Sequence, residues 1–369
     1  DEVLSRKMAL FLLGATSPIA YLLSPAAVPT APRALHSAPP VVAPRVLPPL
    51  MREHQAAEEA EDAAQDEEML AAAEVARSAE TLAACREAAA KRVAALGDDA
   101  AAVAMLEKGG AAPTGKMAKL LKKPKGTIAL IGEGVRIDVV SMGGYDLDDP
   151  AYLSGEFRVG GCAAVSVIMT ERDALKPDAL AATAAEQETV RGDFPGPMPV
   201  LLRDDVIDPI QLAAAAAAGA KMALLSVALV GADGLAPLVA EANRLGLESV
   251  VRVGTEEEID VALGAGAKMV CIGDVSTAQA EELLGKLPDD VVSVADFEAR
   301  DVRGVWKVRD MGFNAIIIGK GLLDVCVRDR VPPAAVIKAM NSKGSVKFGL
   351  GMQKGRLEGS KENLGTIAM

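Results

Sequence analysis

Eight short runs of apolar, largely β-branched residues follow Gly126, and stretches of helix-forming composition separate them. Each run is apolar throughout rather than alternating, which indicates strands of a parallel sheet that is buried on both faces. We place these strands at Thr127–Ile131, Ala163–Ile168, Pro199–Leu202, Met222–Val227, Ser249–Val253, Met269–Ile272, Val291–Val294 and Ala315–Ile318. Eight strand–helix units over 127–340 predict an α/β fold of the (β/α)8 TIM-barrel class, for which about 200 residues is the lower size.

The stretches between the runs carry helix-start signals. We expect helices at Pro209–Ala218, Gly234–Leu245, Thr255–Ala265 and Thr277–Leu287. Pro209 suits the first turn of its helix, and Thr255 and Thr277 suit N-caps because glutamates or other helix formers follow them. A doubly wound open sheet is the competing fold. It is disfavoured because no GxGxxG sequence follows the first predicted strand.

An acid-free leader precedes these elements. No Asp or Glu occurs between Met8 and Arg52, and the segment opens with an apolar run, Ala9–Leu23, that Pro18 interrupts. That run is short for a bilayer span and suits the apolar core of a signal sequence, so we expect no transmembrane helix in the mature chain. Residues 1–50 therefore predict a plastid-targeting (chloroplast transit) leader. The alternative is a disordered Pro-rich tail that carries no targeting signal.

Three further regions follow the leader. Residues 51–126 form an acidic, Ala-rich helical arm with a basic linker, 127–340 the barrel, and 341–369 a basic, Gly-rich tail. Alanine fills nearly every face of the arm, so we expect a solvated helix or one that packs on a partner. Arm and tail are expected to be additions to the barrel that join a protein complex. For the tail, a solubilising segment is the alternative.

Composition excludes several classes of function. A net charge of −12 and an aromatic content of 3% argue against a nucleic-acid-binding protein. His36 and His54 are the only histidines, which rules out a Ser-His-Asp triad or a histidine metal site in the barrel. The four cysteines form no CxxC pair. We therefore predict no metal and no cofactor.

Polar residues follow the ends of the predicted strands, where barrel enzymes carry their chemistry. The Gly319-Lys320-Gly321 turn opens a helix and is a candidate phosphate site, although a plain turn with a surface lysine fits as well. Arg203 and Arg252 are candidate anion ligands at the barrel mouth. Arg252 has an alternative as a salt bridge to an acidic neighbour; the two candidates are Glu256 and Asp204. Three carboxylates on different loops are a candidate cation site: Glu133, Asp204 and Asp274.

Four segments resemble indole-3-glycerol phosphate synthase: GGCAAVSVIMTE from Gly160, PVLLRDDVIDPIQL from Pro199, LGLESVVRVGTEEEID from Leu245 and MGFNAIIIGKGLL from Met311. The resemblance implies a TIM barrel that closes the ring of a carboxyphenylamino-deoxyribulose phosphate, with loss of CO2 and water, in tryptophan biosynthesis. It also implies lysines as general acid and substrate clamp, and glutamates for the other proton transfers. The implied ligand is a phosphorylated small molecule.

The catalytic set that this resemblance implies is substituted. The family positions are occupied by Leu130, Gly132, Arg203, Arg252, Gly273 and Ala295. By the resemblance, Leu130 stands at a glutamate, Gly132 at the catalytic lysine and Arg203 at the general-acid lysine. A histidine after strand five falls on Gly254, and a Ser-Gly phosphate pair falls on Ala295 and Asp296.

Arginine stays protonated in proteins and is therefore a poor general acid near neutral pH. Losing one acid–base group costs about 10²- to 10⁴-fold in rate, and several are lost together here. The sequence therefore favours a non-catalytic binding or structural subunit. The alternative is an active synthase, or a related phosphosugar lyase, with relocated catalytic groups.

Overall fold

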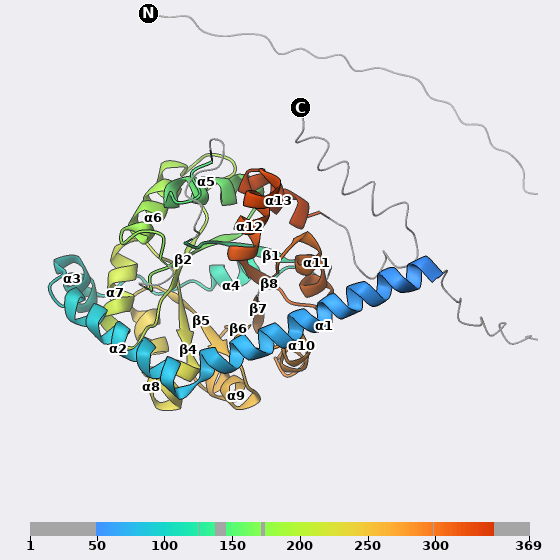
Figure 1. Ribbon diagram of the computed structural model, residues 1–369. Coiled ribbons are helices and arrows are strands. Elements are labelled where there is room, and N and C mark those ends of the chain that lie inside the picture. Colours follow the sequence, from blue (N-terminus) through green and yellow to red (C-terminus); the bar gives the residue numbers. More distant parts are fainter. Residues whose placement is uncertain (1–48, 125, 137–144, 171–173, 298, 343–369) are drawn as a thin grey trace, which may run out of the picture. The chain divides into compact units, whose positions relative to one another are not determined.

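A closed barrel of eight parallel strands forms the centre of the molecule, in the order β1 to β8 around the ring (Figure 1). The computed structural model describes residues 49–124, 126–136, 145–170, 174–297 and 299–342, so nearly all of the leader and tail lies outside the described residues. The strands are β1 Ala129–Gly134, β2 Ala164–Ile168, β3 Val200–Arg203, β4 Met222–Ser226, β5 Glu248–Val253, β6 Met269–Gly273, β7 Val292–Asp296 and β8 Ala315–Ile318. The predicted TIM barrel is confirmed.

Helices surround the barrel and also precede it. They are α1 Pro49–Arg77, α2 Ala79–Leu96, α3 Ala100–Lys108, α4 Lys116–Leu121, α5 Pro150–Gly160, α6 Ala179–Thr189, α7 Pro209–Ala217, α8 Val227–Arg244, α9 Glu256–Gly264, α10 Thr277–Leu284, α11 Val302–Met311, α12 Lys320–Asp329 and α13 Pro333–Met340. No helix in the described ranges is both long and apolar enough to cross a membrane. The described elements from His54 onward belong to one compact unit.

Of the four predicted helix starts, two are confirmed and two are corrected. The helix expected from Gly234 is α8, which begins at Val227 and is interrupted by the non-helical residue Gly231. Pro209 occupies the first turn of α7, and the Thr255 hydroxyl accepts a hydrogen bond from the N–H of Glu258 at the start of α9. At α10 the N-cap is Ser276 rather than Thr277. Ser276 and Gln279 form a capping box: the Ser276 hydroxyl accepts from the backbone N–H of Gln279, and the Gln279 side chain accepts from the backbone N–H of Ser276. These two bonds fix the helix start one residue earlier than predicted.

Successive residues of each strand face opposite sides of the sheet, which separates the core into two layers. Ala129 and Ile131 of β1 pack inside the barrel, in a cluster with side chains of the other strands. Leu130 of β1 packs in the layer between the sheet and the surrounding helices. The same alternation, continued to the end of each strand, decides which polar residues reach the mouth.

The short helix α4 covers the end of the barrel at which the strands begin. Its Leu121 is fully buried in the interior cluster, against the first residues of several strands. The N–H groups of Met117 and Ala118, at the start of α4, donate to the carboxylate of Glu248 at 3.2 and 3.1 Å. A carboxylate at a helix N-terminus is electrostatically favourable, so this contact anchors α4 under the barrel.

The helical arm contacts the barrel rather than being solvated throughout. Helix α3 packs on α7, and α2 packs on α7 and α8. Ala89 and Ala102 are fully buried in these contacts. Because alanine lets two helices approach closely on any face, the arm packs without the apolar stripe that a sequence argument looks for.

Candidate functional site at the barrel mouth

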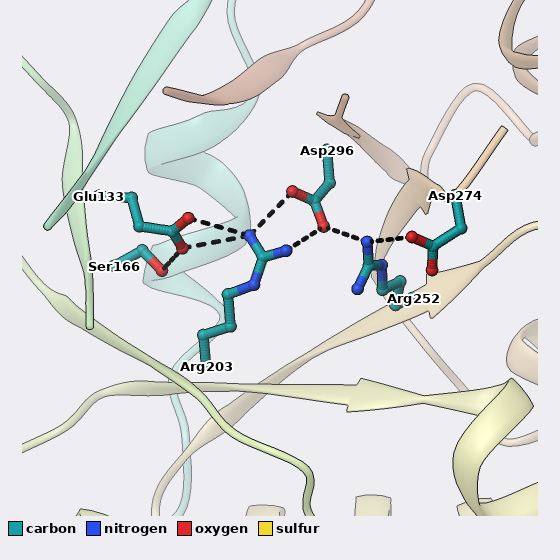
Figure 2. A network of polar contacts seen from close by, with 6 residues as sticks. All are labelled: Glu133, Ser166, Arg203, Arg252, Asp274 and Asp296. Atoms are coloured by element: carbon teal, nitrogen blue, oxygen red, sulfur yellow. Dashed lines mark hydrogen bonds and ion pairs between the residues drawn. The ribbon is translucent and has the colours of Figure 1, made fainter. Parts of the chain in front are cut away.

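The mouth of the barrel carries five inward-facing polar side chains from five strands: Glu133, Ser166, Arg203, Arg252 and Asp296. Each lies two or four residues beyond an apolar residue of the interior cluster, as the alternation of a strand requires. Figure 2 shows these side chains joined, with Asp274, in one continuous set of polar contacts. We call these six residues the mouth network.

Arg203 is the bridge between the two halves of the mouth network. Its Nη1 donates to both carboxylate oxygens of Glu133, at 3.2 and 3.1 Å, and to Oδ1 of Asp296 at 2.9 Å. Its Nη2 donates to Oδ2 of Asp296 at 3.0 Å. The hydroxyl of Ser166 donates to Glu133 at 2.7 Å. The guanidinium is therefore held between two carboxylates.

Arg252 completes the mouth network from the opposite side. Its Nη2 lies 2.8 Å from Oδ1 of Asp274 and 3.0 Å from Oδ2 of Asp296, so Asp296 is shared by both arginines. The alternative salt bridges of Arg252 to Glu256 or Asp204 are therefore wrong. A Cβ atom at Gly273 would lie 2.8 Å from Nε of Arg252, so a side chain there would displace Arg252 from this position.

Burial and charge shift the two buried carboxyl groups in opposite directions. Burial raises the pKa of Glu133 above its usual value, and the nearby Arg203 only partly offsets this. Burial also acts to raise the pKa of Asp296, but Arg203 and Arg252 together hold it below its usual value. For Arg203, burial favours the neutral form, but Asp296 and Glu133 outweigh it and raise the guanidinium pKa. Arg203 therefore remains a permanent cation and cannot deliver a proton.

Two arginines of the helical arm reach the same end of the barrel. Arg92 of α2 lies 2.6 Å from the carboxylate of Asp204, just after β3, and that carboxylate also accepts from Gln211 at 3.0 Å. Arg77, the last residue of α1, lies 2.5 Å from Glu258. A Cβ at Gly254 would lie 2.4 Å from the guanidinium of Arg77, so a side chain there would displace Arg77.

Two positions that the resemblance assigns to catalysis face away from the mouth. Leu130 packs in the helix-facing layer, and a Cβ at Gly132 would lie 2.5 Å from the ring of Phe157 on α5. The inward positions of β1 are instead Ile131 and Glu133. A catalytic side chain has to reach the mouth. The assignment of the family's catalytic positions to Leu130 and Gly132 is therefore offset by one residue from the positions of β1 that face the mouth.

The same alternation separates Ala295 from Asp296 on β7. Ala295 packs in the helix-facing layer, whereas Asp296 lies at the centre of the mouth network. Sequence reasoning placed both in a phosphate-binding pair and so missed Asp296 as an ion-pair partner. The period-two pattern of Val292, Val294 and Asp296 is the signal that could have found it.

The phosphate candidates after β8 do not join the mouth network. Lys320 begins α12, and its Nζ lies 2.7 Å from Asp324 on the same helix. A Cβ at Gly319 would lie 3.3 Å from Oε2 of Glu133, and a Cβ at Gly321 would lie 2.5 Å from the carbonyl oxygen of Ala299. These glycines therefore permit close packing within the protein.

The three carboxylates proposed for a cation are also divided. Glu133 and Asp274 bind different arginines of the mouth network, and Asp204 binds Arg92. Within the described ranges, no group of three or more potential metal ligands is present. The carboxylates are thus neutralised by arginines.

Comparison with known proteins agrees with the geometry of the barrel. Residues 60–329 match the family model for indole-3-glycerol phosphate synthase. The indole-3-glycerol phosphate synthase of Rhodococcus opacus is 30% identical over 185 residues, which is 48% of this chain and 66% of that one. The enzyme of Streptomyces griseus is 31% identical over 225 residues, or 57% of this chain and 79% of that one.

Among solved structures, the tryptophan synthase alpha subunit of Legionella pneumophila matches with a TM-score of 0.45 and 13% identity, covering 62% of this chain and 97% of that one. The family match begins at residue 60, so most of the helical arm lies inside the family's region and is not an addition to it. With the eight-stranded barrel and a family match over most of its length, the chain belongs to the indole-3-glycerol phosphate synthase family.

Proposed function

We propose that this chain is a non-catalytic member of its family, of tryptophan-biosynthesis ancestry, in which the barrel acts as a binding or structural subunit. The observation that carries the proposal is the sharing of Asp296 by Arg203 and Arg252. By the resemblance, Arg203 stands where the family has its general-acid lysine. There it is a permanent cation fixed by two carboxylates, which is a structural arrangement rather than a proton donor.

Charge balance argues in the same direction against a phosphorylated ligand. The mouth network contains two guanidinium groups and three carboxyl groups, from Glu133, Asp274 and Asp296. A phosphate group would therefore meet no excess of positive charge, even with Glu133 protonated. Lys320, the remaining candidate cation, is paired with Asp324 and largely exposed. Phosphate recognition normally depends on unpaired basic groups or free backbone N–H groups.

Internal filling of the mouth supports the proposal independently of charge. Gly254 and Gly273 are inward positions whose missing side chains give room to Arg77 and Arg252. By the resemblance, these two positions carry histidine and asparagine in the family. The side chains of Arg77 and Arg252 thus fill the mouth beside these glycines. Larger residues at the two positions would instead form the wall of a cavity.

A working enzyme with relocated groups is the second candidate, and one observation favours it. Glu133 faces the mouth, is 5% exposed and has a raised pKa because of its burial. A buried carboxyl that holds its proton is the kind of group that enzymes use as a general acid. Its bonds to Arg203 and Ser166 oppose that role, because they stabilise the carboxylate.

Calorimetric titration of the purified full chain with the carboxyphenylamino-deoxyribulose phosphate substrate tests the proposal. We expect no saturable heat, whereas the S. griseus relative in a parallel titration should bind. Saturable binding that Arg203→Ala weakens would contradict the proposal, because it would show that the mouth accepts the substrate. An Arg191→Ala variant serves as control, since Arg191 is exposed and pairs with Glu188 on α6.

We propose in addition that residues 1–50 direct the chain to a plastid. The support is compositional: an apolar run followed by an acid-free, Arg-containing segment. A fluorescent protein fused behind residues 1–50 should accumulate in plastids of an alga whose plastids derive from a secondary endosymbiont. Cytosolic fluorescence of that fusion would contradict the proposed plastid targeting. It would not bear on the proposal about the barrel.

A further inference from the structure

The large apolar side chains that are exposed within the described ranges fall on two regions of the protein. Leu70 and Val75, 47% and 64% exposed, lie on α1. Leu120 on α4, Val159 at the end of α5 and Phe194 in the α6–β3 loop belong to the other region. Phe194 is 99% exposed, the highest exposure among these large apolar side chains.

The second region surrounds a groove at the end of the barrel where the strands begin. This groove has a volume of about 330 Å3 and a mixed lining, in which Leu120, Ile128 and Met198 are apolar and Lys123 and Asn341 are polar. Gly196 and Pro197, which follow Phe194 closely in the chain, line it as well. Phe194 therefore belongs to the loop that borders the groove.

The segment that borders this groove through Leu120 and Lys123 carries three lysines. Lys116, Lys119 and Lys123 follow each other at helical spacing on and just after α4. Lys116 and Lys119 are exposed, and within the described part of the chain none of the three carries an ion pair. We define the basic patch as these lysines together with Leu120 and Phe194.

Helix α1 presents the opposite charge with the same spacing. Its barrel side carries Asp66 and Glu68, which bind the backbone N–H of Thr277 and the side chain of Arg300. Glu67, Leu70 and Glu74 are exposed at positions i, i+3 and i+7, next to Val75. We define the acidic patch as these four residues. Neither Glu67 nor Glu74 has an ion pair in the described part.

The two patches lie at opposite ends of the barrel, because α1 contacts the loops that follow the strands whereas α4 covers the strand beginnings. They therefore cannot meet within one molecule, but they are opposite in charge: Glu67 and Glu74 lie on either side of Leu70, and lysines lie on either side of Leu120. We infer that the acidic patch of one copy of this chain docks on the basic patch of a second copy, with Phe194 beside α1 of that copy.

A contact between different patches is heterologous, so each copy offers one free patch after docking and the assembly grows head to tail. The facing surfaces comprise about two helical turns and one aromatic side chain, which is small for a stable interface and predicts micromolar or weaker affinity. Opposite charges on the two patches predict that salt weakens the association. None of this depends on whether the mouth is catalytic.

Sedimentation velocity of the full chain over about a hundredfold range of concentration tests the inference. We expect the weight-average sedimentation coefficient to rise with concentration and to fall back on addition of salt. Phe194→Ser and Leu70→Ser, each in exposed positions, should weaken the association at least about tenfold, because anchor residues dominate small interfaces. Lys91→Glu, an exposed charge reversal on α2 outside both patches, should leave it unchanged.

Mixing the two variants gives the decisive result. Phe194→Ser retains an intact acidic patch and Leu70→Ser an intact basic patch, so an equimolar mixture should form a 1:1 dimer that grows no further. A chain that stays monomeric throughout would overturn the inference. So would association that neither variant weakens, or a mixture that forms no dimer.

Discussion

Asp296 binds both arginines of the mouth network, so at the scale of single residues the network depends on it. Its carboxylate lies 2.9 Å from Arg203 and 3.0 Å from Arg252, and its side chain is 9% exposed. Removing one partner of a buried ion pair leaves the other charge without compensation, which costs more than the pair contributes when intact. The two guanidinium groups would be left to Glu133 and Asp274.

Asp296→Asn should therefore lower the free energy of unfolding by about 3 kcal/mol, toward the lower end of the range for buried pairs because both arginines retain some exposure. Asp274→Asn is the matched control. Asp274 contacts one arginine, is 23% exposed and has a φ of 55°, which asparagine tolerates. Its loss should cost about 1 kcal/mol or less. Urea unfolding of both variants measures the difference, and equal costs would refute the central place of Asp296.

The raised pKa of Glu133 predicts a pH dependence of stability. Between the usual glutamate pKa of 4.5 and its raised value, the folded chain holds this proton while the unfolded chain has released it. The contribution of Glu133 to the free energy of unfolding therefore falls as pH rises through that window, and it stays constant at higher pH. Glu133→Gln removes the titration, so the stability of the variant relative to the parent should increase over the same window.

Unfolding free energies of parent and Glu133→Gln, measured at a series of pH values from about 4 to 8, check this sign. The lowered pKa of Asp296 contributes a loss of stability only in more acidic solution, below the usual aspartate pKa and outside this pH window. A difference that is independent of pH would mean that Glu133 titrates normally.

At the scale of elements, the strands were predictable except at the ends that form the site. The predicted strand at Thr127–Ile131 ends three residues before β1 does, and the one at Val291–Val294 ends two residues before β7 does. An apolar run identifies a strand only where both faces are buried in apolar surroundings. At the mouth the inner face is polar, so hydrogen bonding continues beyond the hydrophobic pattern. Glu133 and Asp296 occupy these continuations.

The junction between α1 and the barrel can be tested at Gly254. In Gly254→Ala the new methyl group would overlap the guanidinium of Arg77, so Arg77 should leave Glu258 and the end of α1 should open more often. Amide hydrogen exchange near Ser78 should accelerate by about tenfold or more, the factor that corresponds to about 1.4 kcal/mol.

Gly264→Ala is the control for that experiment. Gly264 is the last residue of α9 and a Cβ there meets nothing within 4 Å, so the change should be neutral or stabilise by a few tenths of a kcal/mol. Unchanged exchange near Ser78 in Gly254→Ala would show that Arg77 does not hold the arm in place.

At the scale of the whole molecule, the arm was the element that sequence reasoning placed least well. Its helices were predictable from composition, but alanine on all faces gives no apolar stripe that would locate a partner. Besides its alanine contacts, the arm forms ion pairs with the barrel through Arg77 and Arg92, whose partners lie more than a hundred residues away in the chain. Spacing along a sequence cannot reveal pairs of this kind.

The resemblance located the family and most of the barrel, whereas the site required the fold. The predicted strand ends, rather than the resemblance, placed Arg203 and Arg252 at the mouth, because each lies at the end of a strand whose register is marked by apolar neighbours. The resemblance could not show that both arginines are bound by one aspartate, because that contact joins three strands across the barrel (Figure 2).

We propose that a mouth closed by its own ion pairs performs no ring closure. Incubation of the carboxyphenylamino-deoxyribulose phosphate substrate with an excess of the purified full chain, followed by indole fluorescence, tests it most directly, because enzyme excess reveals even one slow turnover. Fluorescence should stay at the level of substrate alone while the S. griseus relative converts the substrate fully. Indole formation by this chain that disappears in Arg203→Ala would contradict the claim.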